Sequence, residues 1–275
     1  MTPNDIRLDG KVAFITGGAG GIGAGVARNL ANFGARLAIA DIDAESGERL
    51  AAEIREQGGH ALFLHTDVNQ TEQIHTAVEQ AASHFGRLDI LINNAGGVRR
   101  TPFLQQTEKS WRKHIDFNLI STLTATQAAA RAMIAFGHGG TIVNIASSEG
   151  LRAAPGFAVY AACKAGMISF TRSMALELAE HDIRVHVLAP DMILTPGLAP
   201  YFEAAGEDGR AARDRYIPMG RVGSTDELAG VVIFLVSNLA TYITGLTLPV
   251  DGGAIASSGW TRSPNTGAWD LYHAP

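Results

Sequence analysis

A tyrosine and a lysine lie four residues apart, at Tyr160 and Lys164, within a segment whose pattern predicts a helix over residues 157–180. Side chains with this spacing share one face of a helix, so the ammonium group would lie close to the phenol. A free tyrosine titrates at about pH 10, and a neighbouring positive charge favours the phenolate and lowers its pKa. Such a phenol could take a proton from an alcohol hydroxyl or return it, which is general acid/base catalysis.

Ser147 and Asn118 could assist this proton transfer. Ser147 follows a predicted strand over residues 141–145, at the carboxyl end where ligands bind in parallel sheets. Its hydroxyl could donate a hydrogen bond to a substrate oxygen, although the adjacent Ser148 carries the same group. Asn118 lies inside a predicted helix over residues 108–136, where asparagine is a poor helix former, so its side chain is expected to serve a purpose. In each case the alternative is a residue with no role in chemistry.

A glycine-rich segment reads Thr-Gly-Gly-Ala-Gly-Gly-Ile-Gly over residues 16–23, between a predicted strand (12–15) and a predicted helix (21–33). Glycines let the backbone approach a pyrophosphate closely, and the first N–H groups of the helix are free to bind it. Because the segment directly follows the first strand of a strand–helix–strand unit, a dinucleotide site is favoured over an ordinary structural turn.

Asp41 follows the second predicted strand, about 20 residues beyond the glycine-rich turn, where an acidic residue can bind the adenosine ribose. A carboxylate at this place would repel a 2′-phosphate. The glycine-rich turn and position 42, which is Ile42, hold no lysine or arginine that would attract one. We therefore expect NAD(H) rather than NADP(H); the alternative is that Asp41 only caps the next helix.

Short apolar runs alternate with helical patterns along the chain. The predicted strands cover residues 12–15, 36–40, 61–64, 88–92, 141–145, 184–188 and 246–250, and the predicted helices 21–33, 44–57, 72–85, 108–136, 157–180 and 225–237. Strands that are apolar throughout and joined by helices indicate a parallel sheet covered on both faces. The expected fold class is α/β, a doubly wound Rossmann fold with a mostly seven-stranded parallel sheet.

Residues 1–253 are expected to form a single Rossmann-type catalytic domain, because no linker or repeat divides them. Residues 191–224 form a long connection after the sixth strand, and long connections in compact domains are usually lids or binding loops. The C-terminal tail, residues 254–275, carries three aromatic residues. They either dock onto a surface or belong to a frayed terminus.

The bulk composition narrows the class of partner. The chain of 275 residues has a formal net charge of −5 and a single cysteine. No basic stripe is present, which argues against nucleic acid. The nine histidines show no metal-ligand spacing, so we expect no metal. The first residues lack the pattern of a signal peptide, and no apolar stretch is long enough to span a bilayer. These features favour a cytoplasmic protein.

The motifs and their order resemble those of the short-chain dehydrogenase/reductase family in its single-domain form. Residues 16–23 match the family pattern TGxxxGxG, residues 93–96 match NNAG, and residues 160–164 match YxxxK. Ser147 precedes the tyrosine of the last motif by thirteen residues, as in the family, and this spacing selects it over its neighbour. The resemblance runs from residue 10 to residue 253.

This resemblance implies a role for each matching residue. The catalytic residues would be Asn118, Ser147, Tyr160 and Lys164, with Asn118 holding a water that relays protons past Lys164 and Lys164 also binding the nicotinamide ribose. The residues expected to contact NAD are Gly17, Gly21, Ile22, Gly23, Asp41, Ile42, Asp67, Val68, Asn94, Gly96, Tyr160, Lys164, Pro190, Ile193 and Thr195. The residues expected to line the substrate pocket are Ser147, Glu149, Leu151, Tyr160, Met192 and Leu198.

Two further expectations concern surroundings of the site. Asp191 follows Pro190 where the family often has glycine, so the chain departs from the family pattern beside the expected nicotinamide contacts. Arg152 could recognise an anionic group, although a solvated arginine is the more ordinary interpretation.

The family also implies that the fourth and fifth predicted helices pair two chains into a dimer, and that two dimers form a homotetramer.

The combined prediction is an NAD(H)-dependent oxidoreductase that interconverts a secondary alcohol and a ketone by hydride transfer, with Tyr160 as general acid/base. The substrate would be a small molecule such as a hydrophobic alcohol of hydroxysteroid type, or a sugar or polyol. One alternative is a 3-oxoacyl thioester reductase. An alternative of a different class is a non-catalytic dinucleotide-binding sensor or scaffold, against which the intact set of four catalytic residues argues.

Overall fold

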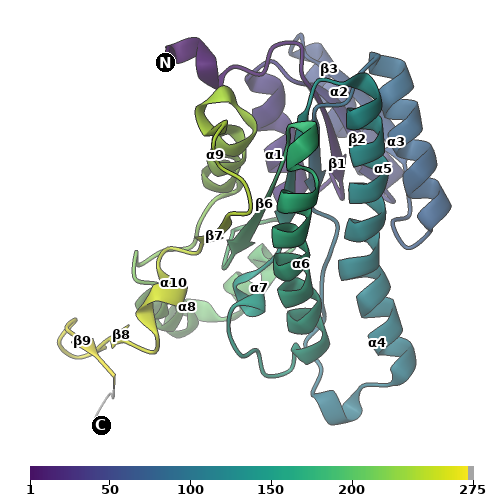
Figure 1. Ribbon diagram of the computed structural model, residues 1–275. Coiled ribbons are helices and arrows are strands. Elements are labelled where there is room, and N and C mark those ends of the chain that lie inside the picture. The colour runs from purple at the N-terminus through teal and green to yellow at the C-terminus, as the bar shows by residue number, and fades with distance from the viewer. Residues whose placement is uncertain (272–275) are drawn as a thin grey trace.

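The computed structural model describes residues 1–271, so Tyr272, one of the three aromatic residues of the tail, lies outside the described residues. Seven parallel strands form one sheet in the order β3-β2-β1-β4-β5-β6-β7 (Figure 1). The strands are β1 (Val12–Thr16), β2 (Arg36–Asp41), β3 (His60–His65), β4 (Ile90–Asn93), β5 (Gly140–Ile145), β6 (Ile183–Pro190) and β7 (Thr247–Val250). This arrangement confirms the predicted fold class.

Helices cover both faces of the sheet. One face packs against α1 (Gly21–Asn32), α2 (Ala44–Glu56) and α9 (Thr225–Val236), and the other against α3 (Thr71–Phe85), α5 (Ser121–Phe136) and α6 (Ala158–Glu177). Single 3₁₀ turns lie at Pro3–Ile6, Phe103–Gln105, Ser148–Gly150, Ala179–His181 and Asn238–Ala240. None of the helices formed by residues 1–271 combines the length and apolar character needed to cross a bilayer.

The strands are apolar throughout because both faces of the sheet are buried. All five residues of β1 are buried. Successive side chains of a strand point to opposite faces, so Ala13 and Ile15 enter the core under α1 and α9, whereas Val12 and Phe14 enter the core under α3 and α5. A sheet with one face exposed to water would instead show strands in which apolar and polar residues alternate.

The strand order reverses beside β1, which pairs with β2 on one side and β4 on the other. In sheets of this kind ligands bind outside the carboxyl ends of the strands at such a reversal. The glycine-rich turn follows β1, residues 94–97 follow β4, Ser147 follows β5 and Asp191 follows β6. Parallel pairing therefore brings all four segments to one edge.

The helix predicted over residues 108–136 is divided by a turn of π-helix. It consists of α4 (Glu108–Ile115), the π turn at Asp116–Ile120 and α5. The N–H of Ser121 donates to the carbonyl of Asp116, five residues earlier. Such π turns are frequent at functional sites, and this one contains Asn118.

The connection over residues 191–224 is largely helical, which the sequence did not predict. It contains α7 (Ala199–Ala204) and α8 (Gly206–Tyr216), and its ends meet in a parallel bridge between Ile193 and Gly223. We call residues 191–224 the substrate loop, after the role as a lid or binding loop that the sequence predicts for them.

The tail leaves the sheet through the short helix α10 (Ala254–Ser257). It then forms a two-stranded antiparallel hairpin of β8 (Thr261–Arg262) and β9 (Trp269–Asp270). The Arg262 guanidinium lies over the Trp269 ring, 4.7 Å from its centroid, while Trp260 and Trp269 stay about half exposed. Figure 1 shows the hairpin beyond α8, away from the sheet. The described part of the tail is therefore folded, and β8 lies next to α8.

Candidate active site

The glycine-rich turn packs so closely that two of its glycines admit no side chain. A Cβ at Gly23 would lie 2.1 Å from the carbonyl oxygen of Gly17, and one at Gly17 would lie 2.9 Å from Cα of Ala95. The Asn94 side chain holds the turn by donating to the carbonyl oxygens of Gly17 (2.7 Å) and Thr16 (3.2 Å). Asn94 thus has a structural role that the motif alone did not reveal.

The start of α1 is open to an anion. Gly20 is the N-cap of α1, so no side chain caps the first N–H groups of this 12-residue helix. A Cβ built at Gly20 would meet nothing within 4 Å. Free N–H groups and the helix dipole favour a phosphate at such a place. The turn therefore fits the pyrophosphate of a dinucleotide.

Asp41 lies beside this turn and does not cap the next helix. Its carboxylate accepts hydrogen bonds from the backbone N–H groups of Ala19 (2.9 Å) and Asp43 (3.0 Å). The cap of α2 is Asp43, which accepts from the N–H of Ser46. The capping alternative for Asp41 is therefore wrong.

The other predicted adenosine contacts lie on the same edge of the sheet. Asp67 and Val68 follow β3, the neighbour of β2. The Asp67 carboxylate accepts from the backbone N–H of Asn69 at 2.9 Å, and Val68 is buried. Ile42, by contrast, is 60 % exposed beside Asp41.

Asn118 points inward. It is fully buried, its Oδ1 accepts from the N–H of Gly97 (2.9 Å), and its Nδ2 donates to the carbonyl oxygens of Gly97 (3.0 Å) and His114 (3.0 Å). The surface-facing alternative is therefore wrong. These bonds tie the π turn to the loop that follows β4.

Lys164 and Asn118 converge on Gly96. A Cβ at Gly96 would lie 2.9 Å from Oδ1 of Asn118 and 3.2 Å from Nζ of Lys164. Lys164 is buried and its Nζ donates to the carbonyl oxygen of Ile145 at 2.8 Å. Burial lowers the pKa of Lys164 to about 8, so the ammonium group releases its proton more readily than a surface lysine does.

Tyr160 lies close to Lys164, with Nζ 5.6 Å from the centroid of its ring. Contrary to the prediction, the pKa of Tyr160 is raised by the surrounding protein groups. Burial is the main cause, and the charge of Glu149 adds to it, while hydrogen bonding with the Ser147 side chain opposes it. The expectation was wrong because the loss of hydration penalises the phenolate, and sequence spacing carries no information about hydration.

Ser147 is distinguished from Ser148 by its surroundings. The Ser147 hydroxyl oxygen accepts from the N–H of Glu149 at 3.2 Å, and hydrogen bonding by the same hydroxyl acts on Tyr160. Ser148 is fully buried and directs its hydroxyl toward the carbonyl oxygen of Ala189. The geometry therefore agrees with the family spacing in selecting Ser147.

The substrate loop starts beside the glycine-rich turn. A Cβ at Gly21 would lie 3.6 Å from Cγ2 of Thr195, so Thr195 is close to the start of α1. Pro190 and Ile193 are buried. The Ile193 side chain enters the core, and this leaves only its backbone to face a ligand.

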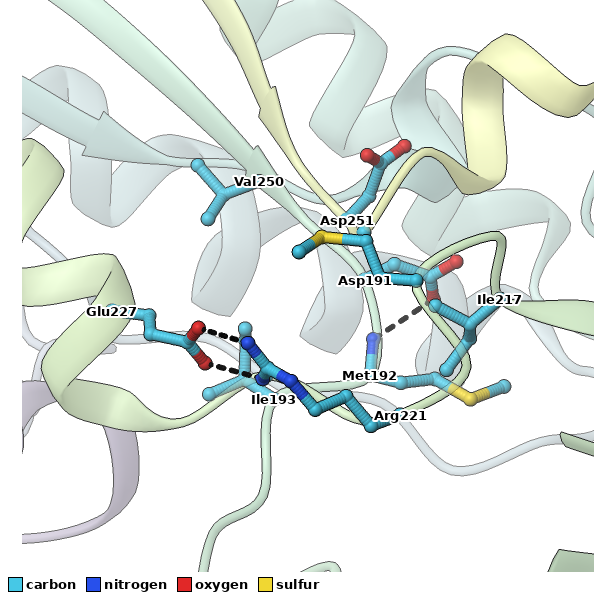
Figure 2. Close-up of a pocket in the computed structure, with 11 residues that line it drawn as sticks. Asp191, Met192, Ile193, Ile217, Arg221, Glu227, Val250 and Asp251 are labelled. Atoms are coloured by element: carbon cyan, nitrogen blue, oxygen red, sulfur yellow. Dashed lines mark hydrogen bonds and ion pairs between the residues drawn. The ribbon is translucent and has the colours of Figure 1, made fainter. Parts of the chain in front are cut away.

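Three predicted pocket residues are apolar and only partly covered. Leu151 and Leu198 are 38 % and 40 % exposed, and Met192 is half-buried. Met192 also lines a cavity of about 110 Å³ between the substrate loop, the end of β7 and α9 (Figure 2). Within it, Figure 2 shows Arg221 paired with Glu227. None of the four proposed catalytic residues lines this cavity.

Arg152 and Tyr216 are two residues whose place at the site the sequence did not reveal. The Arg152 guanidinium contacts Glu149 (2.8 Å), Asp191 (3.1 Å) and the hydroxyl of Tyr216 in α8. The interpretation of Arg152 as a solvated side chain is therefore wrong. No signal in the sequence links residues 64 positions apart.

The described residues 1–271 contain no group of three His, Cys, Asp or Glu side chains placed to hold a metal ion. The functional groups on this edge of the sheet are a phenol, a hydroxyl, an amide and a buried amine, beside a turn that fits a pyrophosphate.

Comparisons with known proteins agree with this geometry. The family profile described as Enoyl-(Acyl carrier protein) reductase matches residues 17–254. The chain is 37 % identical to the 3-oxoacyl-[acyl-carrier-protein] reductase FabG of Chlamydia muridarum, with 90 % of this chain and 98 % of that protein covered. It is 38 % identical to the sorbitol dehydrogenase of Cereibacter sphaeroides over the same shares of the two chains.

A solved structure has a very similar fold. A 7α-hydroxysteroid dehydrogenase, in complex with NADH and 7-oxo glycochenodeoxycholic acid, superposes with a TM-score of 0.86 at 32 % identity, covering 92 % of this chain and 97 % of that one. Matches of this length and identity establish common descent as well as a common fold. The chain belongs to the short-chain dehydrogenase/reductase family of oxidoreductases, which bind a nicotinamide dinucleotide and act on small molecules.

Proposed function

We propose that this protein is an NAD(H)-dependent oxidoreductase that interconverts a secondary alcohol and a ketone, with Tyr160 as general acid/base. The observation that carries the proposal is the convergence of Lys164 and Asn118 on Gly96, with Lys164 Nζ 5.6 Å from the ring of Tyr160. If Tyr160 and Lys164 had no role in chemistry, there would be no reason to bury the amine of Lys164 beside the amide of Asn118.

The residues divide the work as follows. When bound, the nicotinamide dinucleotide supplies the hydride acceptor for oxidation and the hydride donor for reduction. Ser147 donates a hydrogen bond to the substrate oxygen, and Tyr160 takes the hydroxyl proton in oxidation or returns it in reduction. Lys164 passes the proton from Tyr160 toward solvent, and Asn118 fixes the loop on which this path runs.

The cofactor would lie along the edge formed by β1, β2 and β3. The start of α1 would hold the pyrophosphate, Asp41 the adenosine ribose, and Asp67 and Val68 the adenine. Lys164 would also bind the nicotinamide ribose, and the backbone at Ile193 together with Thr195 would hold the carboxamide.

A panel of alcohols and ketones tests the reaction. NADH absorbance is followed with hydroxysteroids, polyols, simple secondary alcohols and 3-oxoacyl thioesters, each with both cofactors. We expect turnover with NAD⁺ and a secondary alcohol. Turnover of the thioesters alone would establish the second candidate, which the similarity to the FabG reductase favours. Tight NADH binding with no turnover of any compound would support the dinucleotide sensor instead.

Cofactor choice gives a separate prediction. The wild type is expected to favour NAD⁺ over NADP⁺ by about 10²-fold in kcat/KM, because Asp41 would repel a 2′-phosphate by a few kcal/mol. Asp41→Asn keeps the size of the side chain but removes its charge, so we expect the preference to fall about tenfold. Asp43→Asn removes the same charge from the cap of α2 and should leave the ratio unchanged. Equal or better efficiency of the wild type with NADP⁺ would remove the assignment.

The assembly is proposed to be a homotetramer built from pairs of α4–α6 faces. Between these helices lies an open apolar hollow of about 490 Å³ lined by Phe103, Trp111, Ile115, Leu119, Ala158, Val159, Ala162 and Cys163. The Phe103 and Trp111 rings stack there, with centroids 5.4 Å apart. An exposed apolar face of this kind is typical of a protein interface.

Size-exclusion chromatography with light scattering tests the assembly. The wild type is expected to elute with the mass of four chains. Ile115→Asp, which places a charge in the apolar hollow, is expected to give smaller species while circular dichroism shows an intact fold. A monomeric wild type, or a variant with unchanged mass, would contradict this interface.

A further inference from the structure

Four side chains outside the proposed chemistry form one connected cluster, which we call the Arg152 cluster: Glu149, Arg152, Asp191 and Tyr216. Nη2 of Arg152 contacts Oε1 of Glu149 at 2.8 Å and Oδ2 of Asp191 at 3.1 Å. Nη1 donates to the hydroxyl of Tyr216, which in turn donates to Oδ2 of Asp191 at 3.2 Å. The guanidinium also lies 5.6 Å from the centroid of the Tyr216 ring.

The cluster joins three segments that are distant in sequence. Glu149 and Arg152 lie on the turn after β5, just beyond Ser147. Asp191 directly follows β6, and Tyr216 is the last residue of α8 in the substrate loop. One guanidinium therefore connects α8 to the turn that carries the proposed oxygen-binding hydroxyl.

The cluster is largely withdrawn from solvent. The side chains of Arg152, Glu149 and Asp191 are 27 %, 23 % and 10 % exposed. Ion pairs this enclosed are screened less by salt than surface pairs, and removal of one partner leaves an unpaired charge. Since the N–H groups of Arg152 are directed at three protein partners, it has little capacity to bind an anionic substrate as well.

One carboxylate of the cluster acts on the proposed general base. Glu149 raises the pKa of Tyr160, and it also raises that of Asp191, where burial is the main cause and Arg152 acts in the opposite direction. Besides Glu149, the groups of the protein that act on the phenol are Ser147 and Cys163. Lys164 lies below the ring. With two carboxylates and one guanidinium, the cluster has a formal charge of −1.

We propose that Arg152 is a positioning residue that holds α8 of the substrate loop against the turn bearing Ser147 and offsets the charge of Glu149 beside the Tyr160 phenol. This inference rests on the proposed function of Tyr160. It also accounts for Asp191, which replaces the glycine often found after this strand in the family: the carboxylate completes the set of partners for the guanidinium.

Paired variants separate the two parts of this role. Arg152→Met keeps the length of the side chain and loses its charge, so the Glu149 carboxylate acts on Tyr160 unopposed. The pKa of Tyr160 and the acidic limb of the kcat/KM profile for oxidation should then move up by about 0.5–1 pH unit. Glu149→Gln removes the carboxylate that acts on the phenol, so the limb should move down by a similar amount. The double variant should return close to the wild-type limb.

KM for the alcohol and the rate of proteolysis test whether Arg152 holds α8 in place. In Arg152→Met, α8 loses its bond to the turn after β5 but keeps the bond from Tyr216 to Asp191. KM for the alcohol should therefore rise about fivefold or more, and trypsin should cleave faster after Arg210, Arg213 or Arg215 of α8. Arg152→Lys restores the charge but not the fork of donors. It should therefore restore the pH limb and leave KM raised.

A matched control is Arg28→Met, which breaks the ion pair of Arg28 with Glu53 between α1 and α2. It removes the same charge, and neither the pH limb nor cleavage in α8 should change. The ionisation of Tyr160 is also measured without turnover, as the ultraviolet difference titration between each variant and the same variant carrying Tyr160→Phe. Shifts of equal sign in Arg152→Met and Glu149→Gln, or unchanged titration and cleavage, would overturn the inference. Absence of turnover in the wild type would remove the proposed function. The ultraviolet titration of Tyr160 and the tryptic cleavage in α8 would then still test the role of Arg152.

Discussion

Tyr160→Phe is expected to reduce kcat by about 10³-fold while NADH binding is unchanged. The substitution removes only the phenol hydroxyl, which the proposed mechanism uses to exchange the substrate proton, and general acid/base groups typically contribute 10²–10⁴-fold. The ring remains to pack above Lys164, whose own hydrogen bond to Ile145 does not involve the tyrosine. The loss should therefore appear in the chemical step and not in folding or in cofactor affinity.

Steady-state kinetics and an NADH fluorescence titration measure the two quantities separately. Tyr242→Phe is the matched control, because this tyrosine is fully exposed in the loop before β7. Loss of its hydroxyl should change neither kcat nor NADH binding. Retention of more than about one tenth of the wild-type kcat by Tyr160→Phe would refute the role assigned to the phenol. A parallel loss of NADH binding would mean that the ring, and not the hydroxyl, is what the site needs.

The fold was predictable because strands that are buried on both faces appear in the sequence as short runs of apolar residues. A strand such as β1 is apolar at every position, since both of its faces are covered, and all seven predicted strands occur within two residues of their expected places. The π turn at residues 116–120 was not predictable. It adds one residue to a helical turn, and the only trace of it in the sequence is the unfavourable Asn118.

The helices of the substrate loop were missed for a different reason. Helix α8 buries no residue, so it has no apolar stripe. Its one signal was charge: Glu207 and Asp208 lie in the first turn and Arg213 and Arg215 in the last, which is the distribution that the helix dipole favours. Reading that pattern would have predicted α8.

The site was predictable as far as it depends on local spacing. The spacing between Tyr160 and Lys164 predicted their contact, but the direction of the pKa of Tyr160 depends on burial by segments far apart in the chain. The Arg152 cluster likewise depends on contacts between the turn after β5, the end of β6 and α8. Only the three-dimensional arrangement resolves such contacts.

Gly23→Ala is expected to reduce both stability and cofactor binding. The new Cβ would lie 2.1 Å from the carbonyl oxygen of Gly17 and 2.6 Å from Nδ2 of Asn94. Neither atom can move freely, because Asn94 is itself bonded to the turn. Overpacking of this kind costs about 1–3 kcal/mol, which lowers the melting temperature by about 2–4 °C per kcal/mol in a chain of this size. The displaced turn should weaken NADH binding by about 10²-fold, as small misplacements at such sites do.

Two alanine substitutions separate these effects, measured by thermal unfolding and NADH titration. Gly230→Ala in α9 and Gly20→Ala at the start of α1 each place a Cβ with nothing within 4 Å. Gly230→Ala should stabilise the protein by about 0.5–1 kcal/mol, since glycine is unfavourable within a helix, and should leave binding unchanged. Gly20→Ala should keep the melting temperature and lose NADH affinity, because its methyl group would occupy the space assigned to the pyrophosphate. If Gly20→Ala binds NADH as tightly as the wild type, the pyrophosphate does not lie at the start of α1, and the loss in Gly23→Ala would have to come from the distorted turn alone.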